Sequence, residues 1–133
     1  MRLWHYELIP YLPKSQLWLL AQWRELNSIY KKQDNHILIN YIYNYSKDYL
    51  LEYSNLVIDE FENRGYKIRS LDNYNCYFKE LVGETVDMNL LIYPEHNDEY
   101  LKICYYNLYE KYLRGQKDFS KEQFGKLKEF IEN

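Results

Sequence analysis

The chain has 133 residues, a formal net charge of −3 at pH 7 and 47% hydrophobic residues. This length builds about one domain around one core, so we expect a single domain over residues 1–133. The acidic balance argues against general attraction to phosphate, because nucleic-acid affinity depends heavily on lysine and arginine. Cys76 and Cys104 are the two cysteines, which fits a reduced, cytoplasmic compartment better than a disulfide framework.

The start of the chain carries neither a long apolar run nor an acidic surplus. Glu7, Pro10 and Pro13 interrupt its apolar residues, so we expect no secretory leader and no membrane span. Residues 1–32 hold five basic and two acidic side chains, whereas the other 101 residues hold 12 basic and 18 acidic ones. This basic pole is either ordinary local variation of a surface or a site for a polyanion.

Two helices are predicted in the first half of the chain. Pro13 precedes a stretch of good helix formers, which predicts a helix over residues 14–32. The short apolar run at residues 36–40 fits either a strand or a buried loop. A second helix is predicted over residues 46–64, where apolar side chains recur at helical spacing between an N-cap serine and Gly65.

The second half of the chain predicts two more helices. Residues 66–93 show no long period and are expected to form an extended connection. Apolar positions recur at helical spacing over residues 101–112 and again over residues 120–131, and Ser120 opens a capping-box pattern. The expected fold class is therefore all-α: a single compact domain of three to four helices with long irregular connections.

The sequence contains no pattern typical of a metal site or of a nucleotide-binding loop. The three histidines, His5, His36 and His96, are far apart, and no His-x-x-x-His or Cys-x-x-Cys spacing occurs. The four glycines form no phosphate loop and no nucleophile elbow. We therefore expect no metal and no cofactor.

The adjacent pair Arg24 and Glu25 stands within an otherwise nearly uncharged helical stretch. Consecutive residues on a helix point about 100° apart, so both cannot face solvent if the neighbouring apolar face is buried. One reading is an ordinary exposed ion pair on the helix surface. The other is a buried or half-buried carboxylate, whose pKa desolvation would raise towards the range useful for acid–base chemistry.

Several short islands resemble a known family. They are Leu8–Leu12, Trp23–Leu26, Leu56–Glu60 leading to Arg64–Ile68, the opening Met1–His5, and Tyr93–Leu101. Their order and spacing are similar to those of the pyrimidine-dimer DNA glycosylases, the family of the phage enzyme endonuclease five, and especially to a bacterial branch of it. The resemblance implies a helical, cofactor-free enzyme that flips a nucleotide out of damaged double-stranded DNA, cuts the glycosidic bond and nicks the strand at the abasic site.

The resemblance also implies site residues. In that family the nucleophile is the α-amine of the mature first residue, and a glutamate preceded by an arginine supplies the essential carboxylate. The matching positions here are Met1 and Glu25 as catalytic residues, with Arg2 and Arg24 binding DNA. Methionine is normally retained before a bulky residue such as Arg2. We expect Lys31 and Lys32, from the basic pole, to bind DNA as well, and the protein to act as a monomer.

An α-amine is a suitable nucleophile on physical grounds. Its pKa is about 7.7 to 8.0, against about 10.4 for lysine, so roughly a tenth of it is unprotonated at neutral pH. Attack on C1′ of the sugar would expel the base and give an imine. Glu25 could then stabilise the cationic sugar and remove the C2′ proton for strand scission.

Two histidines are further candidates for the site, and a non-catalytic function is the alternative to the enzyme. His5 and His36 could line the same pocket, contact phosphate or orient Glu25, although a lone histidine in such a position is more often a structural residue. The alternative to the enzyme is a non-catalytic helical module that binds nucleic acid or a protein partner through the basic pole.

Overall fold

The computed structural model describes residues 2–17, 22–33, 35–81 and 91–133. These residues form six α-helices and two 3-10 helices, and no strand occurs among them. In chain order the elements are η1 (Tyr6–Tyr11), α1 (Lys14–Leu17), α2 (Gln22–Lys31), η2 (Asn40–Asn44), α3 (Lys47–Arg64), α4 (Asp72–Tyr77), α5 (Asp98–Leu113) and α6 (Lys121–Glu132). The all-α prediction is confirmed.

The helices of the first half begin and end close to the predicted places. The segment predicted as a helix over residues 14–32 contains α1 and α2, and its residues 18–21 lie outside the described residues. Ser46 precedes α3 but makes no capping hydrogen bond, whereas Gly65 ends the helix with a φ of 77°. The amide of Tyr66 then donates to the carbonyl of Phe61 at 2.9 Å, which closes the last turn.

The helix count needs a correction. Four of the described helices have ten or more residues, which agrees with the predicted three to four; the short α1 lies within the segment predicted as the first helix, and the short α4 is additional. Helix α4 lies in the segment predicted as an extended connection. Its six residues are fewer than two turns, so no apolar period can be read from them. Packing stabilises α4: Tyr30 of α2 has its ring centroid 6.2 Å from that of Tyr74, and Asn73 donates to Asn27 at 3.1 Å.

The apolar run at residues 36–40 forms neither of the expected structures in full. It is a turn, in which the amides of Ile39 and Asn40 both donate to the carbonyl of His36. Ile39 is buried, whereas Ile37 is 79% exposed. The run is therefore an anchored surface turn between α2 and η2.

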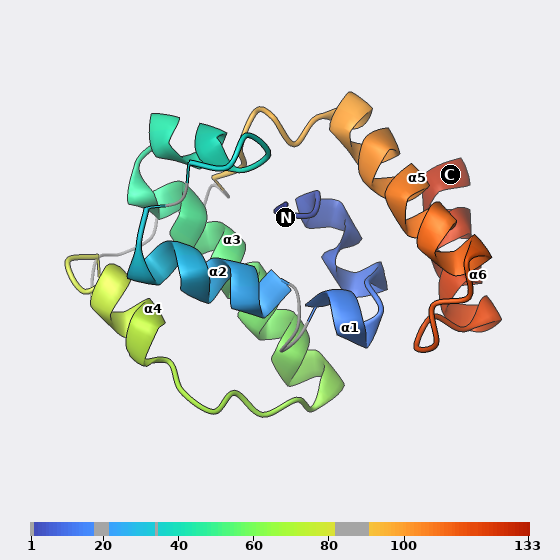
Figure 1. The fold of residues 1–133 in the computed structure, drawn as a ribbon, viewed down its shortest axis with the longest axis horizontal. Helices are drawn as coiled ribbons and strands as arrows, with labels where there is room; N and C mark the ends of the chain where they lie inside the picture. Colours follow the sequence, from blue (N-terminus) through green and yellow to red (C-terminus); the bar gives the residue numbers. More distant parts are fainter. Residues whose placement is uncertain (1, 18–21, 34, 82–90) are drawn as a thin grey trace.

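The N-terminal segment lies in the middle of the molecule. Figure 1 shows it between α2 and α3 on one side and α5 and α6 on the other, and η1 contacts α3, α5 and α6. Its buried side chains include Leu3, Trp4, Leu8 and Leu12. The start of the chain is thus part of the core, in contrast to most chain termini, which are poorly ordered unless they are tied down.

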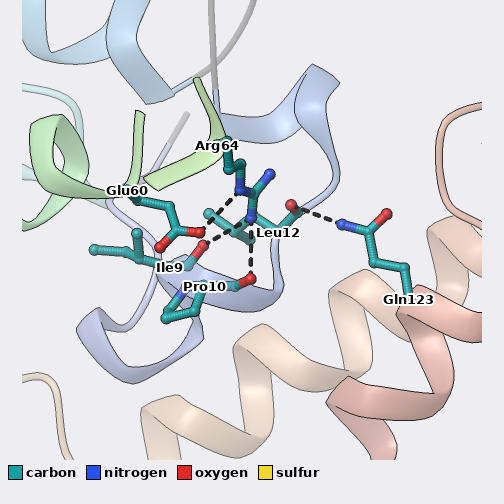
Figure 2. Close-up of polar contacts among 6 residues, drawn as sticks. All are labelled: Ile9, Pro10, Leu12, Glu60, Arg64 and Gln123. Atoms are coloured by element: carbon teal, nitrogen blue, oxygen red, sulfur yellow. Dashed lines mark hydrogen bonds and ion pairs between the residues drawn. The ribbon is translucent and has the colours of Figure 1, made fainter. Parts of the chain in front are cut away.

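Side chains from two helices hold the far end of η1 (Figure 2). The guanidinium of Arg64, at the end of α3, donates to the carbonyl of Pro10 at 3.0 Å and to that of Ile9 at 3.4 Å, and it pairs with Glu60 at 2.9 Å. Gln123 of α6 donates to the carbonyl of Leu12 at 3.0 Å. These donors bind backbone carbonyls at and just beyond the end of η1, where the carbonyl of Ile9 also accepts from the amide of Leu12 at 3.3 Å.

The capping box predicted at the start of α6 forms only by half. The hydroxyl of Ser120 accepts from the amide of Gln123 at 3.1 Å, as the pattern predicts. The side chain of Gln123, which would complete the box by bonding back to Ser120, instead binds the carbonyl of Leu12. A tertiary contact has therefore replaced the local one.

Candidate active site

Helix α2 directs the predicted acidic residue inward. Glu25 is 9% exposed, whereas its neighbour Arg24 is exposed to solvent. The two side chains therefore face different environments, and the reading of an ordinary exposed ion pair is wrong for Glu25. The carboxylate lies on the face of α2 that also carries Gln22, because residues three apart on a helix are neighbours about 5–6 Å apart at Cβ.

Gln22 binds the backbone at the start of the chain. It is 1% exposed and is the first residue of α2. Its Oε1 accepts from the amide of Trp4 at 2.9 Å, and its Nε2 donates to the carbonyl of Arg2 at 3.1 Å. One buried amide group thus fixes two backbone positions within the first four residues.

Two tyrosines from other helices bind the same segment. The hydroxyl of Tyr53 in α3 lies 2.7 Å from the carbonyl oxygen of Trp4 and 2.5 Å from Oε1 of Gln22, so that its proton lies between two acceptors. The hydroxyl of Tyr100 in α5 donates to the carbonyl of Leu3 at 2.6 Å. We call Gln22, Tyr53 and Tyr100 the N-terminal clamp.

The N-terminal clamp consists of neutral groups. Burial raises the pKa of the Tyr53 hydroxyl well above its usual value, and it raises the pKa of Tyr100 in the same direction. Both hydroxyls therefore remain protonated donors throughout the physiological range. Burial likewise raises the pKa of the nearby Cys104 thiol, which keeps it uncharged.

His5 has a structural role in this arrangement. It is 1% exposed, and its Nδ1 accepts from the amide of Glu7 at 3.1 Å, which caps η1. Its ring stacks on Tyr6 and on His96, with centroids 4.8 and 5.5 Å away. Desolvation lowers its pKa. The structure thus places His5 next to the clamped segment as a neutral, packed side chain.

His96 is a buried residue that the sequence did not single out. Its Nδ1 accepts from the amide of Tyr6 at 3.2 Å, so its Nε2 carries the proton and donates to the hydroxyl of Tyr41 at 2.7 Å. Burial, together with the neighbouring His5, lowers the pKa of His96 to about 3. Like the N-terminal clamp, this imidazole connects a distant part of the chain to the N-terminal segment.

The other predicted residues lie at different places. Arg2 is half-buried, with its guanidinium carbon 5.6 Å from the centroid of the Trp4 ring. His36 lies in the exposed turn after α2, where its Nδ1 accepts from the amide of Leu38 at 3.2 Å. Met1 lies outside the described residues.

The two predicted lysines line a pocket at the end of α2. Lys31 and Lys32 are six and seven residues beyond Glu25, or about 9–10 Å along the helix axis. The pocket has a volume of about 580 Å³, and its other lining residues include Lys47 and the tyrosines at positions 43, 45 and 77. The Nζ of Lys47 lies 4.2 Å from the centroid of the Tyr77 ring. Lys47 was not predicted, because it joins Lys31 and Lys32 only in the folded chain.

The described part of the chain offers neither a cluster of metal ligands nor a membrane-spanning helix. It contains no group of three or more histidine, cysteine, aspartate or glutamate residues that could hold a metal ion. Among the helices that the structure describes, none combines the length and the apolar character that a membrane crossing needs.

A family model described as pyrimidine dimer DNA glycosylase matches residues 1–74, which include Arg2, Gln22, Glu25 and Tyr53. DNA glycosylases cut the bond between a base and its sugar. The chain belongs to the pyrimidine dimer DNA glycosylase family, whose members are DNA glycosylases and abasic-site lyases that act on UV-damaged DNA. No curated protein and no solved structure matches the chain.

Proposed function

We propose that this chain is a damage-directed DNA glycosylase with abasic-site lyase activity, in which the α-amine of Met1 is the nucleophile and Glu25 is the acid–base residue. The observation that supports this most is the buried position of Glu25 one helical turn from Gln22, which holds the backbone of Arg2 and Trp4. Met1 is one peptide bond from Arg2, and consecutive Cα atoms are about 3.8 Å apart. The amine is therefore tethered to a segment fixed on the same face of α2.

The proposed reaction begins with attack of the unprotonated amine on C1′. The bond from nitrogen to C1′ forms as the glycosidic bond breaks, and the base leaves with its bonding electrons and takes up a proton. Loss of the amine proton and opening of the sugar give a protonated imine. Glu25 then removes the C2′ proton, the 3′ phosphate leaves by β-elimination, and water hydrolyses the imine to release the protein.

Positive charges around this site match a DNA backbone. Arg24 is exposed and precedes Glu25 on α2, and the backbone carbonyl of Arg2 is bound by Gln22 of the same helix. Guanidinium groups bind phosphate oxygens well. Lys31, the last residue of α2, and Lys32 after it lie about 9 to 10.5 Å from Glu25 along the helix axis, or about three base pairs of DNA at 3.4 Å each. We propose that these four side chains bind the strand on which the reaction takes place.

Borohydride trapping tests the nucleophile. The protein is mixed with a duplex that contains one abasic site, and borohydride reduces any imine to a stable covalent adduct. We expect an adduct whose peptide map places the DNA on Met1, and we expect selective acetylation of the α-amine to abolish it. Absence of an adduct, or an adduct that persists after acetylation, would contradict the mechanism.

The lysines at the end of α2 should contribute affinity that does not depend on the lesion. Changing Lys31→Ala and Lys32→Ala together should weaken binding to damaged and undamaged duplexes alike, because both side chains would contact phosphate. The slope of log K against log salt should become shallower by about 0.9 for each lost contact. Fluorescence anisotropy over a salt series measures this slope.

A matched control removes the same charge from another surface. Lys126→Ala with Lys128→Ala changes two exposed lysines of α6 and lowers the net charge equally. This control should leave the slope as in the unmodified protein. Equal slopes for both double variants would show that the end of α2 does not contact DNA.

A further inference from the structure

The first described residues of this chain are held by side-chain hydrogen bonds as well as by apolar packing. Side chains from three different helices bind four backbone groups of residues 2–4, namely the carbonyls of Arg2, Leu3 and Trp4 and the amide of Trp4. The apolar side chains of Leu3 and Trp4 already bury this segment. Hydrogen bonds add direction to that burial, because they fix where each peptide group points.

We infer that Gln22, Tyr53 and Tyr100 are positioning residues, which hold the chain start so that its amine meets the substrate at Glu25. The inference rests on the function proposed above and goes beyond it by naming what aligns the nucleophile. A nucleophile on a side chain is aligned by the element that carries it. An amine at the end of a chain has no such element, so other parts of the molecule must hold it.

The chemistry of the N-terminal clamp suits that role. A carboxamide offers a donor and an acceptor together, which is what Gln22 needs to bind the carbonyl of Arg2 and the amide of Trp4 with one side chain. The hydroxyl of Tyr53 contacts both Gln22 and Trp4, so it orients the amide as well as the backbone. Hydroxyl and amide groups also bring no charge to the site, so the clamp does not alter the pKa of a nearby amine through a charge of its own.

Residue spacing places the clamp and the carboxylate in one unit. Gln22 and Glu25 lie on one face of α2, so a rigid helical turn links the group that holds the chain start to the group proposed as acid–base residue. Misplacing reacting atoms by about 1 Å can slow a reaction about 100-fold, even when the change lies away from the chemistry. Loss of the clamp should therefore slow the reaction without removing any reacting group.

Three substitutions remove the clamp with little change in shape. Tyr53→Phe and Tyr100→Phe each delete one hydroxyl, and Gln22→Met replaces the carboxamide with an apolar chain of similar size. Under single-turnover conditions with excess protein, we expect each to trap the abasic duplex about 10- to 100-fold more slowly. The dissociation constant for the reduced abasic duplex should stay within about threefold, because no clamp residue is proposed to contact DNA.

A second readout separates positioning from general loosening of the fold. With the clamp removed, the α-amine should react faster with a small acylating reagent, although it reacts more slowly with DNA. Tyr74→Phe is the control. The hydroxyl of Tyr74, on α4, donates to Oδ1 of Asn55, on α3, at 2.7 Å, so this substitution removes a tyrosine hydrogen bond away from the N-terminal segment. Circular dichroism shows that each variant is folded at the assay temperature, and the control should trap DNA and react with the reagent as the unmodified protein does.

The outcomes distinguish the two proposals. If the unmodified protein forms no adduct, the proposed function fails and the positioning role fails with it. If the unmodified protein forms the adduct but Tyr53→Phe, Tyr100→Phe and Gln22→Met trap it at the same rate, the positioning role alone is overturned. Slower trapping in the Tyr74→Phe control, equal to that of the clamp variants, would also overturn it.

Discussion

The substitution Glu25→Gln should lower the single-turnover rate of strand cleavage at an abasic site by about 10²- to 10⁴-fold. This is the usual contribution of a general acid–base residue. Glutamine keeps the volume of the side chain but cannot take up the C2′ proton. Binding to the same duplex should change by less than about threefold. Quenched-flow cleavage of a labelled oligonucleotide gives the rate, and fluorescence anisotropy gives the affinity.

The same substitution should leave the protein folded. Glutamine has nearly the size and shape of glutamate, so the variant should fill the same buried space and stay folded at the assay temperature, which circular dichroism checks. Glu52→Gln provides a control, because Glu52 is a partly buried carboxylate on α3 whose pKa burial raises. This control should cleave DNA at the normal rate. If Glu25→Gln cleaves normally as well, Glu25 takes no part in the reaction, as the rival non-catalytic module requires.

The free energy of unfolding should fall by about 2 kcal/mol between pH 7.5 and pH 5 through His96 alone. Its pKa is about 3 in the folded protein, against 6.5 for an unperturbed histidine. As the pH falls through 6.5, His96 binds a proton in the unfolded chain but stays neutral in the folded protein. Acid therefore favours unfolding. The stabilising contribution is complete above about pH 7 and is lost progressively towards pH 3. Chemical denaturation across this range measures it.

A variant isolates the contribution of this histidine. His96→Gln should show a weaker dependence of stability on pH, although it will be less stable at neutral pH because the contacts with Tyr6 and Tyr41 are altered. An unchanged pH dependence in His96→Gln would show that the folded and unfolded states bind the proton on His96 equally well, which contradicts a lowered pKa in the folded protein.

Periodic patterns predicted the long helices but not the short ones. Helix α3 could be predicted because Leu50, Val57 and Phe61 recur on one face and Gly65 adopts the left-handed conformation that ends the helix. Helix α4 and the 3-10 helix η1 are too short to carry a period. They form because α2, α3, α5 and α6 provide surfaces and hydrogen bonds for them.

The candidate site could be predicted only where its residues are close in sequence. The orientation of Arg24 and Glu25 follows from helical geometry, and the prediction that one of them turns inward is confirmed. Tyr53 and Tyr100 bind residues that are 49 and 97 positions away, so no local spacing could reveal them. Gln22 could have been noticed in the sequence, because it is a polar amide on the apolar face of a predicted helix, three residues before Glu25.

The supports of the N-terminal segment extend beyond the part of the chain that the family model matches. That match ends at residue 74, yet Tyr100, His96 and Gln123 bind Leu3, Tyr6 and Leu12. A fragment made of the matched residues would keep Glu25, Gln22 and Tyr53. It would lose the three side chains from the second half of the chain that bind the backbone of the N-terminal segment. Substitutions in α5 and α6 should therefore change the rate of the reaction, although these helices contain none of the proposed reacting groups.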